Sequence, residues 1–452
     1  MRSPLRRGGA CVGSSGRSHR RRREIHHRRA ARERRSWNIF PIRQLSGHDR
    51  MAHAPQRRTE APVAASAPDA ETLLARIRSI ASEVAAPNAS DVDARGRFPV
   101  ETFAALREAG ALSAAVPAEH GGSGCGMAAL AEQCAALAQG CGASGMVLAM
   151  HHIQVLCLTR HAGASPYFAG VLRDLCERQL LLASVTSEVG VGGDTRTSRC
   201  AVMGDGASIS IDKDATTISY AEHSDAMLIT ARRDADAASS DQVIVYAPRA
   251  ALRLEKTANW DPMGMRGTCS PGFRVRFDGR PEQIVPVPYA DVSALTMVPS
   301  SHILWSGVWT GIAADAVARA SAFVRAEARR TPGTMPPMAA RLAEVSVELQ
   351  TMRNHWQSLA REFDRLALQG DGGGLATIGW ALKMNNLKIA SSEAAPRIVH
   401  RALQVIGIQG YRNDSRYAVG RQYRDVLSAS LMVANERIAS KTATMLLVHK
   451  DD

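Results

Sequence analysis

Cysteine, aromatic residues and long apolar runs are all scarce in this chain of 452 residues. Its 8 cysteines show no paired local spacing, so we expect reduced thiols and a cytoplasmic protein rather than a disulfide framework. The best apolar run, residues 303–316, is interrupted by Asp315. Because a spanning helix needs about 18 or more apolar residues in a row, we expect no membrane partner. The sequence also lacks the apolar core of a secretory signal.

Lysine is absent from the first 50 residues, although this segment holds most of the positive charge. It carries 15 arginines and three acids, which accounts for +12 of the chain's formal charge of +13. Such a segment stays unfolded and binds phosphates without specificity. A nucleic-acid tail, an organelle transit peptide and a true translation start at Met51 are the three interpretations, and we favour the last. Because the rest of the chain is nearly neutral, we expect no nucleic-acid partner.

Composition and periodicity divide the chain into four stretches. Residues 1–68 read as an Arg-rich leader followed by a linker rich in Ala, Pro and Thr. Apolar residues recur at helical spacing over 69–180, which predicts an N-terminal helical domain. Short alternating runs between Gly, Asp and Pro turns predict a β domain over 181–295. Helical spacing returns over 296–452, so we expect a mainly α protein with a small central β domain.

The clearest single helix lies in the last stretch. Apolar residues from Leu342 to Leu366 alternate spacings of three and four without a break. This spacing is typical of a long helix that packs along one face in a bundle.

Several motifs in the β stretch resemble those of the acyl-CoA dehydrogenase family, and they occur in the family's order. Residues 183–194, ASVTSEVGVGGD, resemble the loop C-V-T-E-P-x-x-G-S-D and place Ser187 where the family has a flavin-contacting Thr. Thr217–Ser219 resembles the W-I-T strand, with the Trp lost and the hydroxyl kept at Ser219. Residues 263–270, MGMRGTCS, resemble the turn and following strand that close the β domain.

The helical stretch after the β domain carries three more motifs of this family. AEARRTPG at 326–333 resembles the helix end with R-x-x-F-G, which places Arg329 near the FAD pyrophosphate of a neighbouring subunit. ALQVIGIQGY at 402–411 resembles A-[LV]-Q-I-x-G-G-x-G-Y and supplies Gln404, Gly407 and Gly410, the glycines allowing close backbone approach to the dinucleotide. Tyr423, Arg424 and Asp425 match the Y-R-D that precedes the family's catalytic segment.

The resemblance covers nearly all of residues 70–447 and implies a fold, a cofactor and a reaction. The expected fold is an N-terminal helical domain, a β-barrel-like middle domain and a C-terminal four-helix bundle. The expected cofactor is FAD, bound between the subunits of a homodimer or homotetramer. The expected reaction is α,β-dehydrogenation of an acyl-CoA thioester with hydride transfer to flavin N5, and an electron-transfer flavoprotein is the implied electron partner.

The catalytic base of the family is missing from this sequence. The usual Glu position is Val433, and the position used by a second lineage is Ser301. Three residues are candidate substitutes: Glu436, which would share a helix face with Val433, His302 and His151. The competing interpretations are a solvated Glu paired with Arg437, and histidines whose hydrogen bonds are satisfied in the core. No Cys or carboxylate lies at metal-ligand spacing near them, so we expect no metal site.

Two further functions follow from the missing base. One is a flavin monooxygenase of the same fold, which uses reduced flavin and oxygen and needs no base for an α-proton. The other is a non-catalytic protein whose Arg-rich start binds nucleic acid, which the neutral body disfavours.

Overall fold

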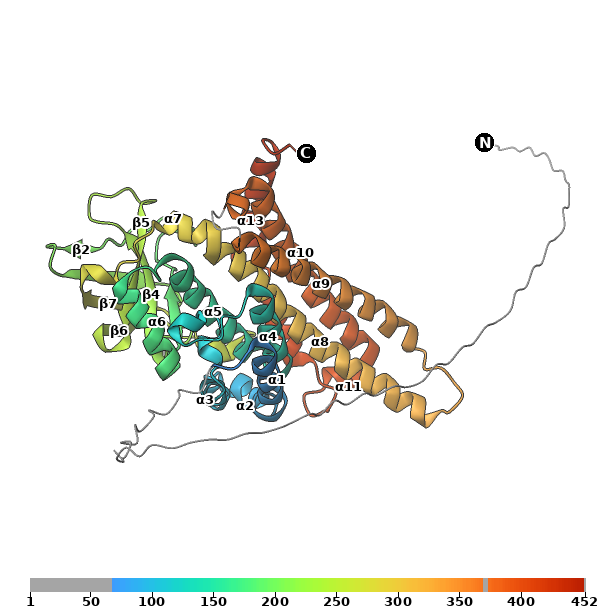
Figure 1. The fold of residues 1–452 in the computed structure, drawn as a ribbon. Helices are drawn as coiled ribbons and strands as arrows, with labels where there is room; N and C mark the ends of the chain where they lie inside the picture. The colour runs from blue at the N-terminus through green and yellow to red at the C-terminus, as the bar shows by residue number, and fades with distance from the viewer. Residues whose placement is uncertain (1–66, 369–372, 451–452) are drawn as a thin grey trace, which may run out of the picture. The chain divides into compact units, whose positions relative to one another are not determined.

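The computed structural model describes residues 67–368 and 373–450, and these belong to one compact unit. The predicted leader at 1–68 and the start at Met51 therefore lie, but for residues 67 and 68, outside the described residues. The unit begins with helices (Figure 1): α1 Ala70–Ile80, α2 Ala86–Arg95, α3 Val100–Glu108, α4 Met127–Gly140, α5 Gly142–His161 and α6 Pro166–Arg178.

Helix α5 forms the centre of this helical part. Among the described residues it is the one helix long and apolar enough to cross a membrane, and 89% of its apolar window is buried inside the protein. That burial is typical of a core helix, because a spanning helix would present its sides to lipid. The sequence predicted an apolar helix over residues 146–158, within α5, but residues 303–316 were taken as the best candidate for a membrane span.

In the part of the chain that the structure describes, the strands that follow form two sheets: β1 Leu182–Val185, β2 Met203–Gly204, β3 Ile209–Ala215, β4 Ala226–Arg232, β5 Gln242–Pro248, β6 Leu252–Lys256 and β7 Phe273–Gly279. One sheet has the order β1-β4-β5, with β1 parallel to β4, and the other is antiparallel with the order β2-β3-β7-β6. Strand β3 alternates buried and exposed side chains, whereas the first six residues of β4 are all buried.

The rest of the unit is helical: α7 Tyr289–Val292, α8 Val298–Arg330, α9 Ala339–Ala367, α10 Ile378–Ile406, α11 Ile408–Tyr411, α12 Gly420–Leu427 and α13 Asn435–Leu446. The three long helices α8, α9 and α10 lie side by side (Figure 1). The predicted apolar seam from Leu342 to Leu366 lies on α9, where seven of its eight members are buried. The expected fold class is confirmed.

Helix α8 also packs tightly against α4, which joins the two helical parts. A Cβ atom on Gly311 would lie 2.2 Å from the Ala135 carbonyl oxygen, and one on Gly307 would lie 2.8 Å from that of Ala131. These glycines let the two helix backbones approach closely. Helices α5, α8 and α12 and the turns after the strands then meet around one region, which holds the candidate site.

Candidate active site

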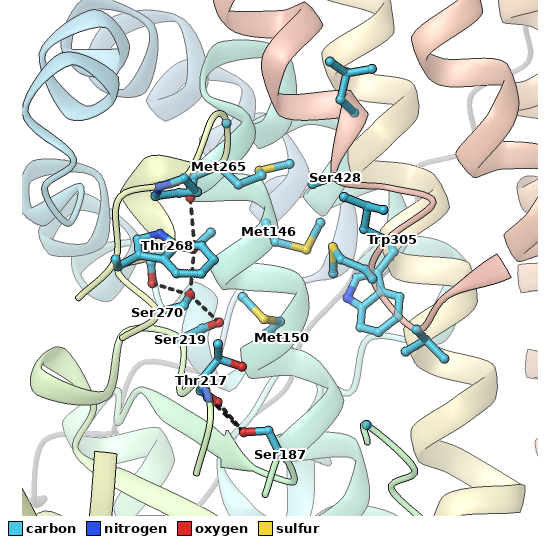
Figure 2. Close-up of a pocket in the computed structure, with 18 of the residues that line it drawn as sticks. Met146, Met150, Ser187, Thr217, Ser219, Met265, Thr268, Ser270, Trp305 and Ser428 are labelled. Atoms are coloured by element: carbon cyan, nitrogen blue, oxygen red, sulfur yellow. Dashed lines mark hydrogen bonds between the residues drawn. The ribbon is translucent and has the colours of Figure 1, made fainter. Parts of the chain in front are cut away.

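Two adjoining cavities lie between the β domain and helices α5 and α8, and Figure 2 shows residues that line the larger one. The larger cavity has a volume of about 620 Å³ and the smaller one about 320 Å³. Eight residues line both, so the two cavities share a wall: Met150, Thr186, Ser187, Thr195, Thr217, Ser219, Trp305 and Val433. The predicted flavin contacts Ser187 and Ser219 are therefore brought together here.

Hydroxyl groups from the β domain form one wall of these cavities. Ser187 Oγ donates to the Thr217 carbonyl oxygen at 2.7 Å and accepts from the Thr217 N–H at 3.2 Å. Ser270 Oγ donates to Ser219 Oγ at 2.8 Å and lies 2.9 Å from Thr268 Oγ1, as Figure 2 shows. Thr217–Ser219 follows the end of β3 in a turn, not in a strand as predicted. A wall of fixed hydroxyls suits the carbonyl and nitrogen edge of a flat heteroaromatic ring.

The opposite wall is apolar. Met146 and Met150 lie four residues apart on α5, so they point from the same helix face, and Trp305 projects from α8 (Figure 2). Leu431 and Met432 complete this wall from the segment between α12 and α13. These residues were not predicted as site residues from the sequence, although the spacing of four between Met146 and Met150 places both on one face of a helix.

Charge is divided unevenly between the two cavities. Among the described residues that line them there is no Asp or Glu. The larger cavity has one charged lining residue, Arg424, whereas the smaller one has Arg196 and Lys441. The smaller cavity can thus hold a phosphate, and neither cavity offers a carboxylate as a base.

The two positions that carry the base in the family both lie at these cavities. Val433 lines both, and its backbone is left-handed with φ 48°, a strained conformation for a β-branched residue. Ser301 lines the smaller cavity, and its Oγ donates to the Met297 carbonyl at 2.6 Å. Neither side chain can serve as a general base of the family's kind.

The candidate substitutes differ in where they lie. Val433 precedes α13, so Glu436 does not share a helix face with it; Glu436 is exposed and does not line either cavity. His151 is fully buried outside the lining, where its Nε2 donates to the Leu112 carbonyl at 2.7 Å and its Nδ1 accepts the Leu182 N–H at 3.0 Å. Both of its ring nitrogens are therefore engaged with the backbone.

His302 is the one candidate that lines a cavity. Burial lowers its pKa to about 4, so the ring is neutral at pH 7. Its Nδ1 lies 3.0 Å from the Met384 carbonyl, an acceptor, which makes Nδ1 the protonated nitrogen and leaves the lone pair on Nε2.

The predicted dinucleotide contacts lie elsewhere. Arg329 lines a third cavity of about 470 Å³ at the end of α8, together with Arg325 and Arg416. Gln404 and Gly407 are exposed at the end of α10, Gly410 is buried in α11, and none of them lines the two cavities described above. Within one chain, these residues are not brought together with Ser187 and Ser219.

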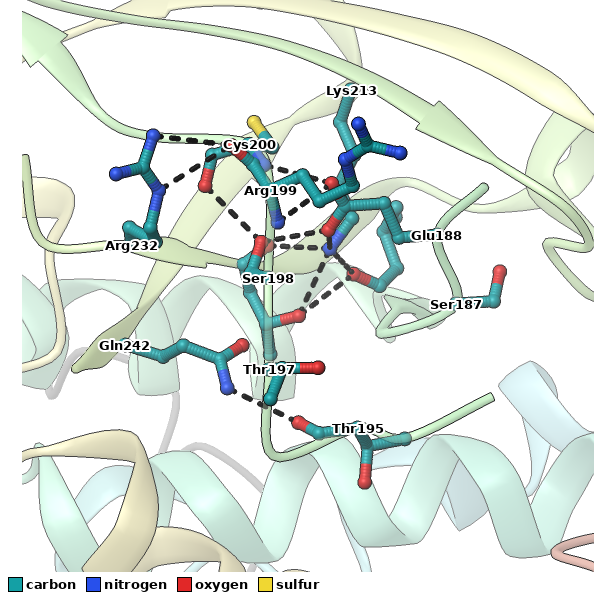
Figure 3. Close-up of polar contacts among 12 residues, drawn as sticks. Ser187, Glu188, Thr195, Thr197, Ser198, Arg199, Cys200, Lys213, Arg232 and Gln242 are labelled. Atoms are coloured by element: carbon teal, nitrogen blue, oxygen red, sulfur yellow. Dashed lines mark hydrogen bonds and ion pairs between the residues drawn. The ribbon is translucent and has the colours of Figure 1, made fainter. Parts of the chain in front are cut away.

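A buried ion pair holds the loop that carries Ser187 and Thr195 (Figure 3). Glu188 Oε1 accepts the N–H groups of Arg199 at 2.9 Å and Cys200 at 2.7 Å, and its Oε2 accepts Ser198 Oγ at 2.7 Å. Lys213 Nζ on β3 lies 3.7 Å from Oε2 and donates to the Thr230 carbonyl at 2.6 Å. Since both charges have hydrogen-bond partners, the pair fixes the loop to the sheet.

The Y-R-D motif holds a second loop at the larger cavity. Arg424 donates to the Met263 carbonyl at 2.8 Å, and Asp425 Oδ1 accepts the Met265 N–H at 2.7 Å. Gly264 lies between them, and a Cβ atom there would lie 2.2 Å from the Arg424 carbonyl oxygen. Burial raises the pKa of Asp425 to about 6. Arg424 therefore forms part of the wall of the larger cavity. Asp425 lies outside the lining and holds the loop at Met265 in place.

Comparison with known proteins agrees with the resemblance that the sequence motifs show. The family description "Acyl-CoA dehydrogenase, N-terminal domain" matches residues 67–165, and "Acyl-CoA dehydrogenase, C-terminal domain" matches residues 294–433. The chain is 24% identical over 387 residues to the probable acyl-CoA dehydrogenase YngJ of Bacillus subtilis, covering 80% of this chain and 92% of that protein.

Solved structures share the fold at low sequence identity. FMN-bound TdsC from Paenibacillus sp. A11-2, described as a dibenzothiophene monooxygenase, has a TM-score of 0.71 at 19% identity and covers 84% of this chain and 98% of its own. The nitrososynthase from Micromonospora carbonacea var. africana has a TM-score of 0.72 at 21% identity, with the same coverage. Since the two family matches together span more than half of the chain, the protein belongs to the acyl-CoA dehydrogenase family, whose fold is that of flavin-dependent oxidoreductases.

Proposed function

We propose that this protein is a flavin-dependent monooxygenase. Reduced flavin would supply two electrons and two protons, so that one atom of molecular oxygen enters a small organic substrate and the other leaves as water. The substrate gains one oxygen atom, and the flavin returns to its oxidised form. A separate reductase of the pyridine-nucleotide-dependent class would supply the reduced flavin.

The observation that carries this proposal is that no Asp or Glu is found among the described residues that line the two cavities. Dehydrogenation of an acyl thioester requires a base within hydrogen-bond reach of the α-carbon, and Val433 occupies the place of that base. Oxygenation by reduced flavin does not require this proton transfer. One wall of the larger cavity is apolar, which suits an uncharged organic substrate.

The residues of the site fit a flavin. The hydroxyl wall around Ser187, Thr217 and Ser219 can bind the polar edge of the ring, and Arg196 and Lys441 can bind its phosphate in the smaller cavity. TdsC has the same fold, is described as a monooxygenase and was solved with FMN, which supports the assignment of the reaction.

We propose FAD as the form of the flavin, in a homodimer or homotetramer. Arg325 and Arg329 line a cavity that is apart from the other two, as expected of residues that contact the pyrophosphate of a neighbouring subunit's FAD. Extraction of the flavin followed by chromatography distinguishes FAD from FMN. A monomer that retains FAD on gel filtration would contradict the shared site.

Dehydrogenation of an acyl-CoA thioester, with an electron-transfer flavoprotein as electron partner, is the second candidate. His302 favours it, since a neutral imidazole at the smaller cavity can accept a proton. The similarity to YngJ over most of both chains also supports it.

One pair of experiments separates the two functions. Under anaerobic conditions, oxidised flavoprotein is titrated with acyl-CoA thioesters of different chain lengths, and the proposal predicts no bleaching of the flavin absorption. The reduced protein is then mixed with oxygen and substrate, and the product is analysed for added oxygen. Bleaching by a thioester that is abolished in His302→Ala would establish the dehydrogenase instead.

A further inference from the structure

We infer that the larger cavity binds an uncharged, apolar ring compound and excludes substrates that carry phosphate, such as CoA thioesters. This inference rests on the proposed monooxygenase function, because it names the substrate class of the same site.

Thioether and indole groups are prominent in the apolar part of the larger cavity's lining, which faces the wall of hydroxyl groups. Its lining includes five methionines, and Trp260 and Trp305 stand among them. Methionine side chains are flexible and polarisable, and each sulfur–aromatic contact contributes about 0.3–1.5 kcal/mol. Such a wall adapts to flat ring systems and offers little to a hydrated, charged chain.

The single charged group of this lining is already paired. The two guanidinium NH groups of Arg424 contact the two carboxylate oxygens of Asp93, one at 3.0 Å, and one NH group also donates to the Met263 carbonyl at 2.8 Å. Nearby, the Asp261 carboxylate is paired with Arg266 at 2.6 Å. A phosphate in or beside the larger cavity would therefore meet an arginine, Arg424, that is already paired. The nearby carboxylates of Asp93 and Asp261 would repel the phosphate.

The smaller cavity has more positive charge in its lining. Arg196 and Lys441 line it, and no Asp or Glu is among its described lining residues. Arg196 is itself paired with Asp194 at 3.1 Å, so the contrast with the larger cavity depends on Lys441. Its cations suit the phosphate of the flavin, while the larger cavity is left for a neutral molecule. A volume of about 620 Å³ lies within the range of sites that bind small organic ligands.

Met432 offers a direct test of this assignment. It lines the larger cavity but not the smaller one and is only partly buried, so a charge there can be tolerated by the fold. Met432→Asp places a carboxylate in the apolar wall, and Met432→Leu keeps the wall apolar. Met335→Asp is the matched control, because Met335 is 78% exposed between α8 and α9.

The measurement is calorimetric titration of the full-length, oxidised flavoprotein with indole, with butyryl-CoA and with free CoA. We expect indole to bind at least about tenfold more tightly than butyryl-CoA. Met432→Asp should weaken indole binding by about tenfold or more, whereas Met432→Leu and Met335→Asp should leave it within about threefold.

Tighter binding of butyryl-CoA than of indole would overturn the inference, as would indole binding that Met432→Asp leaves unchanged while Met432→Leu remains folded. The titration involves no turnover, so its outcome is distinguishable from that of the proposed function. If indole binds as expected but the reduced protein and oxygen yield no oxygenated product from ring compounds, the monooxygenase assignment fails and the site assignment stands.

Discussion

Gly264 shows how closely two backbones approach at the wall of the larger cavity. A Cβ atom there would lie 2.2 Å from the Arg424 carbonyl oxygen, a distance that no side chain can relieve because the neighbour is backbone. The turn must therefore move if any other residue replaces Gly264. Since Met263 and Met265 flank it and line the cavity, movement of the turn changes the binding site.

We predict that Gly264→Ala lowers the free energy of unfolding by about 1–3 kcal/mol and weakens ligand binding in the larger cavity. Urea denaturation and calorimetric titration measure the two effects. Gly170→Ala is the control, because Gly170 lies in α6 with no atom within 4 Å of an added Cβ. Alanine there should leave both quantities unchanged or raise stability slightly. Equal effects at the two positions would refute the close-approach explanation.

His151 links protonation to stability. Burial lowers its pKa from an ordinary 6.5 to about 4, and its two ring nitrogens are bonded to Leu112 and Leu182 in the neutral form. Below pH 6.5 His151 becomes protonated in the unfolded chain, whereas in the folded chain it stays neutral down to about pH 4. The free energy of unfolding must therefore fall as the pH decreases through this window.

We expect this single group to remove up to about 3 kcal/mol of stability between pH 6.5 and pH 4. His302 adds a loss in the same window, and Asp425, whose pKa is raised to about 6, acts in the opposite direction. Urea denaturation of the native protein and of His151→Gln at several pH values isolates the His151 contribution. The variant should lose less stability on acidification; identical slopes would show that His151 is not held neutral.

Lys388 illustrates how one helix shapes a neighbouring segment. It lies on α10 with no exposed surface, and its Nζ donates to the Val433 carbonyl at 3.0 Å and to Asn435 Oδ1 at 2.6 Å. Burial lowers its pKa to about 8. These bonds hold the strained backbone of Val433 at the shared wall of the two cavities and fix the start of α13.

We predict that Lys388→Met lowers the free energy of unfolding by about 1–3 kcal/mol, because the Val433 carbonyl loses the Lys388 donor and Asn435 Oδ1 keeps only the longer bond from Ser392 at 3.2 Å. Ligand affinity should also fall. Lys383→Met on the same helix is the control, since Lys383 is about half exposed and bonded to Glu362, and it should change stability by less than about 1 kcal/mol. An equally small effect at Lys388 would mean that the segment holds its shape without the lysine.

The same elements show which parts of the fold the sequence could predict. The seam on α9 and the alternation in β3 repeat with the period of a helix or of a half-buried strand, and both were predicted. Strand β4 was not predicted as a separate strand, whereas residues 243–246 in β5 were, although both strands begin with six buried residues. Burial of both faces therefore does not explain why β4 was missed. Val433 was placed on a helix because local spacing does not reveal the left-handed backbone that a buried lysine from another helix stabilises.

At the scale of the whole molecule, the site was only partly predictable. Ser187 and Ser219 were found through motifs of the chain, and the structure brings them together. Arg196, Lys441 and Trp305 were missed because they come from three segments whose meeting depends on tertiary packing. Arg329 and Gln404 lie apart from the cavities, which a sequence motif does not show.

The position of Arg329 predicts that neighbouring subunits share the bound flavin. If Arg329 contacts the FAD of a neighbouring subunit, Arg329→Ala should reduce the flavin retained after gel filtration severalfold while the helical content stays constant. Arg330→Ala is the control, because Arg330 is exposed and paired with Glu327 at 2.7 Å. Equal flavin retention in both variants would place the cofactor within one chain.

The most direct test of the proposed monooxygenase function is to determine the origin of the oxygen atom in the product. The reduced flavoprotein is mixed with a ring compound under ¹⁸O-labelled molecular oxygen, and the product is analysed by mass spectrometry. We predict that the product contains one labelled oxygen atom and that acyl-CoA thioesters do not bleach the oxidised flavin. Bleaching by a thioester, with formation of an enoyl thioester and no incorporated label, would contradict it.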